Sequence, residues 1–147
     1  MVPRRVDVVV APDSLHYTRS GAVTGRIHLR CVAADGAIRE YPEADWNDFP
    51  VPVLAWWLDE LSRAADGGGT CRFMEGPHEF TLTPAGAHLL RLRAGGGVWE
   101  VAAADFEASL RRAAALTLAE CERRGWSSRD VFELRRAAGR PTHYPAD

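Results

Sequence analysis

Apolar and polar residues alternate along several short stretches of the chain, the pattern of half-buried β-strands. In residues 26–32, Ile27, Leu29 and Cys31 alternate with basic residues. We expect these apolar side chains to face a core and the basic ones to face solvent. Asp35-Gly36 follows and predicts a two-residue hairpin turn. The other predicted strands span residues 6–10, 38–41, 71–75, 79–83, 87–93 and 98–101.

A period of three to four residues replaces this alternation in three stretches and predicts helices. The first covers residues 51–66, and the second covers residues 104–124, with Gly125 at its C-terminal cap. The third ends near Gly139. Its start is predicted by a capping box from Ser127 to Asp130, with Trp126 and Val131 at the two staple positions. This pattern predicts a structural role for Trp126.

Together these elements predict an α+β fold. We expect a mostly antiparallel sheet of about six or seven strands, with one central helix and two C-terminal helices packed on one face. The chain has 147 residues and no internal repeat, linker or low-complexity stretch. It is therefore predicted to form a single domain over residues 1–147.

The composition limits the chemistry and the compartment. All 18 basic residues are arginine, so reactions that need a lysine are excluded. The three cysteines are far apart and odd in number, which favours free thiols in a reducing cytoplasm over a disulfide framework. No stretch reaches 18 apolar residues, so no membrane association is expected.

Charge is unevenly distributed along the chain. Residues 35–66 hold eight acidic residues and two arginines, a net charge of −6, whereas residues 1–34 carry +3. Phosphate contacts need clustered basic residues, so nucleic acid is not an expected partner. An acidic segment of this kind favours a basic protein partner.

The usual catalytic and cofactor motifs are missing. The chain has no G-x-S-x-G, H-E-x-x-H, phosphate-loop or dinucleotide fingerprint. Its five histidines do not pair with one another or with cysteine at metal-site spacing, so we predict surface or rim histidines, no metal and no cofactor. Glu40, Glu43, Asp45 and Asp48 offer a carboxylate pair for acid–base chemistry or, alternatively, a solvated loop.

The helix predicted over residues 51–66 carries two adjacent tryptophans with different expected environments. Its apolar stripe consists of Leu54, Leu58, Leu61 and Ala65, with Val51 and Trp57 at the edges. Trp56 falls about 200° from Leu54, on the polar face with Asp59 and Glu60. Either Trp56 is an exposed interface anchor, or the loop over residues 42–50 or another element covers it.

Residues 41–49 (YPEADWNDF), 51–58 (VPVLAWWL) and 73–77 (FMEGP) form a recognisable pattern. It resembles small, mostly uncharacterised bacterial proteins with a W-x-D-F…V-L-x-W-W block followed by an F-M-[D/E]-G-P turn. Some of these look like immunity proteins of polymorphic-toxin or contact-dependent systems. The first position differs, since Tyr41 stands where the group has phenylalanine. The resemblance implies a small cytoplasmic single-domain protein and supplies no catalytic residues.

These observations favour a non-enzymatic protein-binding domain, and the resemblance implies an immunity-like protein that neutralises a basic toxin through an acidic, aromatic surface. The predicted partner-binding residues are Asp45, Trp46, Asp48, Trp56, Asp59 and Glu60. One alternative is a small-molecule-binding domain or hydrolase, with a site where Tyr41, Trp46, His28 and the acids of residues 43–48 converge. Another is a homodimeric accessory protein with the tryptophan helix at its seam.

Overall fold

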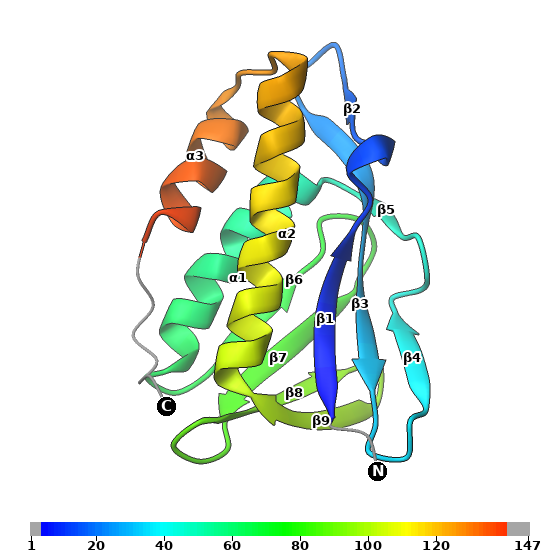
Figure 1. Cartoon of the computed structure of the whole chain (residues 1–147), viewed down its shortest axis with the longest axis vertical. Helices are drawn as coiled ribbons and strands as arrows, with labels where there is room; N and C mark the ends of the chain where they lie inside the picture. Colours follow the sequence, from blue (N-terminus) through cyan, green and yellow to red (C-terminus); the bar gives the residue numbers. More distant parts are fainter. Residues whose placement is uncertain (1–3, 141–147) are drawn as a thin grey trace.

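The computed structural model describes residues 4–140, and it has the predicted α+β class with antiparallel pairing (Figure 1). Its strands form two sheets, of five and four strands, so the prediction of a single sheet is wrong. The first sheet contains β1 (Arg5–Val10), β2 (His16–Tyr17), β3 (Val23–Val32), β4 (Ile38–Tyr41) and β5 (Asn47–Asp48). The second contains β6 (Gly69–Arg72), β7 (Glu79–Pro84), β8 (Leu89–Ala94) and β9 (Gly97–Ala102).

Strand β3 organises the first sheet because its ten residues are long enough to pair with several short strands. β1 pairs along one edge of β3, and β4 and β5 pair with successive parts of it. The second sheet is a simple meander in the order β6-β7-β8-β9.

Helix α1 (Pro50–Ala64) comes between the two sheets in the chain. Its Trp57 indole donates to the carbonyl of Arg72 at the end of β6, at 2.8 Å. The helix therefore packs beside β6, which is the edge strand of the second sheet. The two sheets come near each other at β1 and β9, but these strands do not pair.

The core lies between the sheets and the helices. The alternation in β3 is confirmed for Ile27, Leu29 and Cys31, all buried. His28 is a correction, because it is buried as well and does not face solvent. The rings of Trp57, Phe80 and Phe106 continue the core, with edge-to-face contacts at Phe80.

Helices α2 (Ala103–Arg124) and α3 (Arg129–Ala138) complete the fold, with α3 packed on α1 and α2 (Figure 1). Gly125 ends α2 in the left-handed conformation, with φ 72°, as predicted. The cap of α3 is Ser128 and not Ser127, since the Ser128 side chain accepts from Val131 N. Trp126 stacks on Tyr17 at 5.5 Å. Within residues 4–140, no helix is long and apolar enough to cross a membrane.

Candidate protein-binding surface

Asp48 joins the loop before α1 to the turn after β6. The residue is fully buried, and four groups donate hydrogen bonds to its carboxylate. Oδ2 accepts from Trp46 Nε1 at 2.9 Å and from the backbone N–H of Glu75 at 3.1 Å. Oδ1 accepts from the backbone N–H groups of Phe49, at 2.7 Å, and Met74, at 3.2 Å. We call residues 41–48 and 73–78, held in this way, the loop–turn junction. Asp48 is thus placed inside the fold, which corrects the expectation that it contacts a partner.

His28 forms a hydrogen bond with the middle of the same loop. Its Nδ1 accepts the backbone N–H of Asp45 at 3.3 Å, which places the ring proton on Nε2. Nε2 lies 2.7 Å from Glu40 Oε2, and Arg30 donates to the other oxygen of that carboxylate at 3.0 Å. The expectation of a surface or rim histidine is therefore wrong for His28, whose two nitrogens both face groups of the first sheet and its loop.

Tyr41 connects the two sheets at the junction. Its hydroxyl donates to the carbonyl of Glu79 at 2.9 Å and accepts from the N–H of the same residue at 3.1 Å. The ring of His78 packs edge-to-face against Tyr41 and against Trp46, whose centroid is 4.9 Å away. Tyr41 and Trp46 do converge, as the small-molecule alternative expects, but their polar atoms are already bonded within the chain.

Eight residues of the junction are exposed. Four of them are small or uncharged, namely Ala44, Asn47, Gly76 and Pro77. The other four have charged or long apolar side chains, Glu43 and Asp45 in the loop and Met74 and Glu75 in the turn. We call these four residues the loop–turn surface. No described residue forms an ion pair with their three carboxylates. Sequence reasoning missed Met74 and Glu75 as candidates, although the FMEGP block contains them.

The remaining candidates lie on α1. Trp56 is 43% exposed, so no element of residues 4–140 covers it completely. Asp59 is paired with Arg140 at 3.0 Å, and Glu60 with Arg63 at 2.5 Å. Of the six predicted residues, Asp45 and Trp56 are thus exposed and without an ion-pair partner among the described residues. Asp59 and Glu60 form ion pairs with arginines of the same chain. Trp46 is half-buried.

The described part of the chain offers little for covalent or metal chemistry. Its three cysteines are free and buried. Burial raises the pKa of Cys31 to about 12 and that of Cys71 well above its usual value, so neither thiol is a nucleophile at neutral pH. Residues 4–140 contain no group of three His, Cys, Asp or Glu side chains that could hold a metal ion.

Comparison with known proteins gives no match for this chain among family models, curated proteins or solved structures. The resemblance carried by residues 41–58 and 73–77 stays a prediction. In this chain the two segments are in contact, because Asp48 in the first accepts hydrogen bonds from the backbone of Met74 and Glu75 in the second.

Proposed function

We propose that this chain is a non-enzymatic protein-binding domain that contacts its partner through Trp56 and the loop–turn surface. The exposed indole of Trp56 carries this proposal. It projects from α1, a helix in which ten of fifteen residues are buried. Large aromatic side chains are usually buried, and exposed tryptophans are typical interface anchors.

Charge indicates the kind of partner. Glu43, Asp45 and Glu75 are exposed without an arginine partner among the described residues. Three uncompensated carboxylates attract a basic surface and accelerate association with it. Asp59 and Glu60 contribute less, because intramolecular arginines already balance their charge. A basic toxin, neutralised by occlusion of its surface, fits this picture and the immunity-like resemblance.

The junction supports binding more than catalysis. Of the groups named for the small-molecule alternative, His28, Tyr41 and Asp48 already have hydrogen-bond or ion-pair neighbours inside the chain. Glu43 and Asp45 are exposed on the outside of the loop. The contacts of His28, Tyr41 and Asp48 hold the loop in one conformation before any partner arrives. Pre-organisation of this kind lowers the entropic cost of ordering a loop on binding.

The first experiment measures the contribution of Trp56. The immobilised chain captures its partner from a host lysate at low salt, and the affinity of the purified pair is then compared for Trp56→Ala and Phe132→Ala. Phe132 is a matched control, because it is an aromatic residue of α3 that is 62% exposed. We expect Trp56→Ala to weaken binding roughly thirty-fold, or about 2 kcal/mol, with the melting temperature unchanged. Equal affinities for both variants would contradict the proposal.

A second experiment isolates the charges of the loop–turn surface. The triple variant Glu43→Gln/Asp45→Asn/Glu75→Gln is compared with a control of equal net charge. The control changes the exposed residues Asp13, Asp66 and Glu122 to their amides. Only the first variant should associate more slowly and lose salt dependence. If association is slowed equally in both variants, the effect is due to net charge. If the chain dimerises with rising concentration and Trp56→Ala prevents this, the homodimer alternative is favoured.

A further inference from the structure

We infer that His28 makes the loop–turn surface dependent on pH. When its ring gains a second proton, residues 43–45 lose their bond to β3, so the surface binds a basic partner at neutral pH and binds it more weakly at acidic pH. The inference rests on the proposed function, since it concerns the regulation of the same surface. The structural change itself takes place within the chain and can be measured without a partner.

Both ring nitrogens of His28 have neighbours that require a neutral ring. The residue lies in β3 and is 4% exposed, and the loop between β4 and β5 contacts it (Figure 1). Nδ1 accepts the backbone N–H of Asp45 at 3.3 Å, and Nε2 lies 2.7 Å from Glu40 Oε2. A backbone amide is always a donor, so Nδ1 must carry no proton. A second proton on Nδ1 places two donors against each other and removes the bond to Asp45.

The groups around the ring allow it to become charged. Charged side chains of three neighbouring strands share its sheet face, and the loop adds two exposed ones: Asp7 of β1, Arg26 and Arg30 of β3, Glu40 of β4, and Glu43 and Asp45 of the loop. The carboxylate of Glu40 is the nearest, and Arg30 donates to its other oxygen at 3.0 Å. A protonated His28 therefore keeps a counter-ion and is not left as an unpaired buried charge. Protonation thus breaks the bond to the loop without removing the bond to the sheet.

The backbone of Asp45 depends on the contact with His28. Asp45 has a φ of 59°, in the left-handed region, and is the one residue other than glycine with a positive φ among residues 4–140. Such a conformation persists where surrounding contacts hold it. Within the described part of the chain, His28 provides the one side-chain hydrogen bond to the segment 43–45. Loss of this bond should therefore let the segment leave its present conformation.

The segment that changes is short, because both of its ends are fixed. Before it, the hydroxyl of Tyr41 bonds the backbone of β7. After it, the carbonyl of Trp46 accepts from the N–H of Ile27 at 2.8 Å. Neither of these contacts involves a group that His28 bonds. The change is thus confined to the part of the loop that carries Glu43 and Asp45.

This confined change is sufficient to alter binding. Glu43 and Asp45 supply two of the three uncompensated carboxylates of the loop–turn surface. A partner that meets a released loop must order it again, and this ordering lowers the affinity. Histidine is the side chain whose charge ordinarily changes between about pH 5 and 8, a range in which exposed carboxylates remain ionised. The surface charge stays, and its arrangement changes.

The first test follows the unaltered chain by NMR between about pH 5 and 8. Ring nitrogen shifts of His28 report its protonation, and the exchange rate of the Asp45 amide, corrected for the intrinsic effect of pH, reports the bond to the loop. We expect protection of this amide to fall at least about tenfold as the ring is protonated, and that of Ile27 to stay within about twofold. The inference is overturned if the ring does not titrate in this range, or if protection of Asp45 does not follow it.

The second test uses an arginine octapeptide as a basic probe of the loop–turn surface. His28→Asn keeps a side-chain acceptor that cannot gain a proton, and His78→Asn is the control, since His78 is the other histidine of the junction. Affinity should fall at least about threefold from about pH 7.5 to about 5.5 in the unaltered chain and in His78→Asn, and not in His28→Asn. If the pH dependence disappears in His78→Asn and persists in His28→Asn, the inference is wrong.

The two tests separate this inference from the proposed function. If the octapeptide binds at neither pH, the proposed attraction of a basic partner is contradicted, and the exchange of the Asp45 amide still decides whether His28 controls the loop. If the octapeptide binds equally at both pH values, the proposed function stands and the regulation by His28 is refuted. The exchange experiment uses the unaltered chain, so it remains decisive even if the substitution of buried His28 prevents folding.

Discussion

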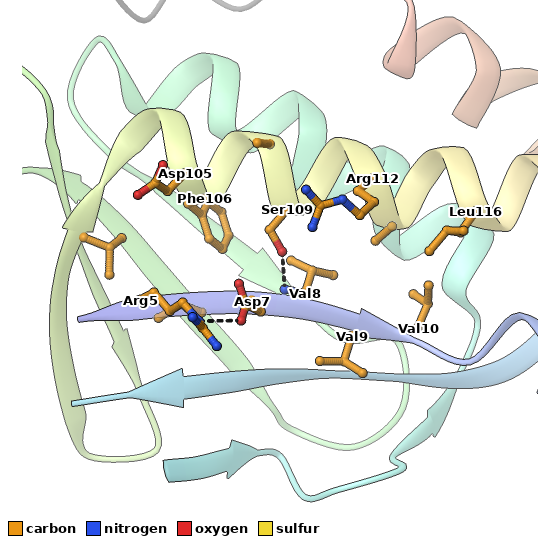
Figure 2. A pocket seen from close by; sticks show the side chains of 14 residues that line it. Arg5, Asp7, Val8, Val9, Val10, Asp105, Phe106, Ser109, Arg112 and Leu116 are labelled. Carbon is orange, nitrogen blue, oxygen red and sulfur yellow. Dashed lines mark hydrogen bonds and ion pairs between the residues drawn. The ribbon is translucent and has the colours of Figure 1, made fainter. Parts of the chain in front are cut away.

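The loop–turn junction and the contact between β1 and α2 differ in how many polar groups they pair. In the junction, one buried carboxylate receives four hydrogen bonds, and a single hydroxyl, that of Tyr41, serves both backbone groups of Glu79. Between β1 and α2, the N–H of Val8 donates to Ser109 Oγ at 2.8 Å, and Asp105 and Arg112 form no ion pair with a described residue (Figure 2).

This difference indicates what each region contributes. Satisfied polar groups stabilise the junction and fix the shape of the loop, so only its outer side chains are available to a partner. The contact between β1 and α2 depends mainly on apolar burial, since Val6 is 2% and Val8 8% exposed and the bond from Val8 to Ser109 is the one hydrogen bond between these two elements among residues 4–140.

The largest expected effect separates two aspartates of the same loop. Asp48→Asn replaces an acceptor by a donor among four N–H groups, and we expect a loss of about 3–5 kcal/mol in the free energy of unfolding. Asp45→Asn makes the same change at an exposed side chain and should stay within about 0.5 kcal/mol. Urea denaturation measures both. Similar values for the two variants would mean that Asp48 is not the centre of the junction.

Proline substitutions distinguish the two edges of β1. Val9→Pro removes an N–H that faces β3, whereas Val10→Pro removes one that faces away from β3. Val9→Pro should therefore cost about 1–3 kcal/mol more than Val10→Pro in urea denaturation. The opposite order would mean that Val10, and not Val9, pairs with β3 through its N–H.

Tyr41→Phe tests the connection between the sheets. The variant keeps the ring contacts with Phe73 and His78 and loses only the hydroxyl that bonds Glu79. We expect about 1–2 kcal/mol of destabilisation and faster exchange of the Glu79 amide, measured by urea denaturation and hydrogen exchange. An unchanged Glu79 amide would show that the sheets are held together elsewhere.

The smallest effect is expected for Ser109→Ala. It removes the acceptor of Val8 N–H in a contact that is buried between β1 and α2, and the loss of this one neutral hydrogen bond should cost about 1 kcal/mol in urea denaturation. The Val8 amide should then exchange faster. A loss comparable to that of Asp48→Asn would mean that this single bond stabilises the fold as much as the four bonds of the junction.

Much of the fold was predictable from local patterns. The three helices begin and end within two residues of their predicted limits, since helical periodicity and the glycine stop signals act over a few residues. The hairpin at Asp35-Gly36 and the meander from β7 to β9 follow from turn residues between alternating stretches. The predicted cap of α3 was Ser127, whereas the observed cap is Ser128. This small error arises because two adjacent serines both offer a capping hydroxyl.

The candidate site was predictable only in part. Helical periodicity correctly places Trp56 on the polar face of α1, but its exposure depends on whether another element packs there. Asp48 looked like a solvated loop acid, because nothing within a few residues shows that the backbone of Met74 and Glu75, more than twenty residues later, surrounds it. His28 occupies a polar position in the alternation, yet the loop of Asp45 folds over it.

The sequence by itself determined the limits of the helices, the order of the longer strands, the core face of α1 and the acidic segment, because these depend on neighbours along the chain. The short strands β2 and β5 were not predicted. Only the tertiary structure decided that the strands divide into two sheets, that Asp48 is an internal acceptor and that α2 covers the edge of β1. These features arise from contacts between residues far apart in sequence, such as Val8 and Ser109. No local pattern encodes those contacts, since each is one of many pairings that the same local preferences allow.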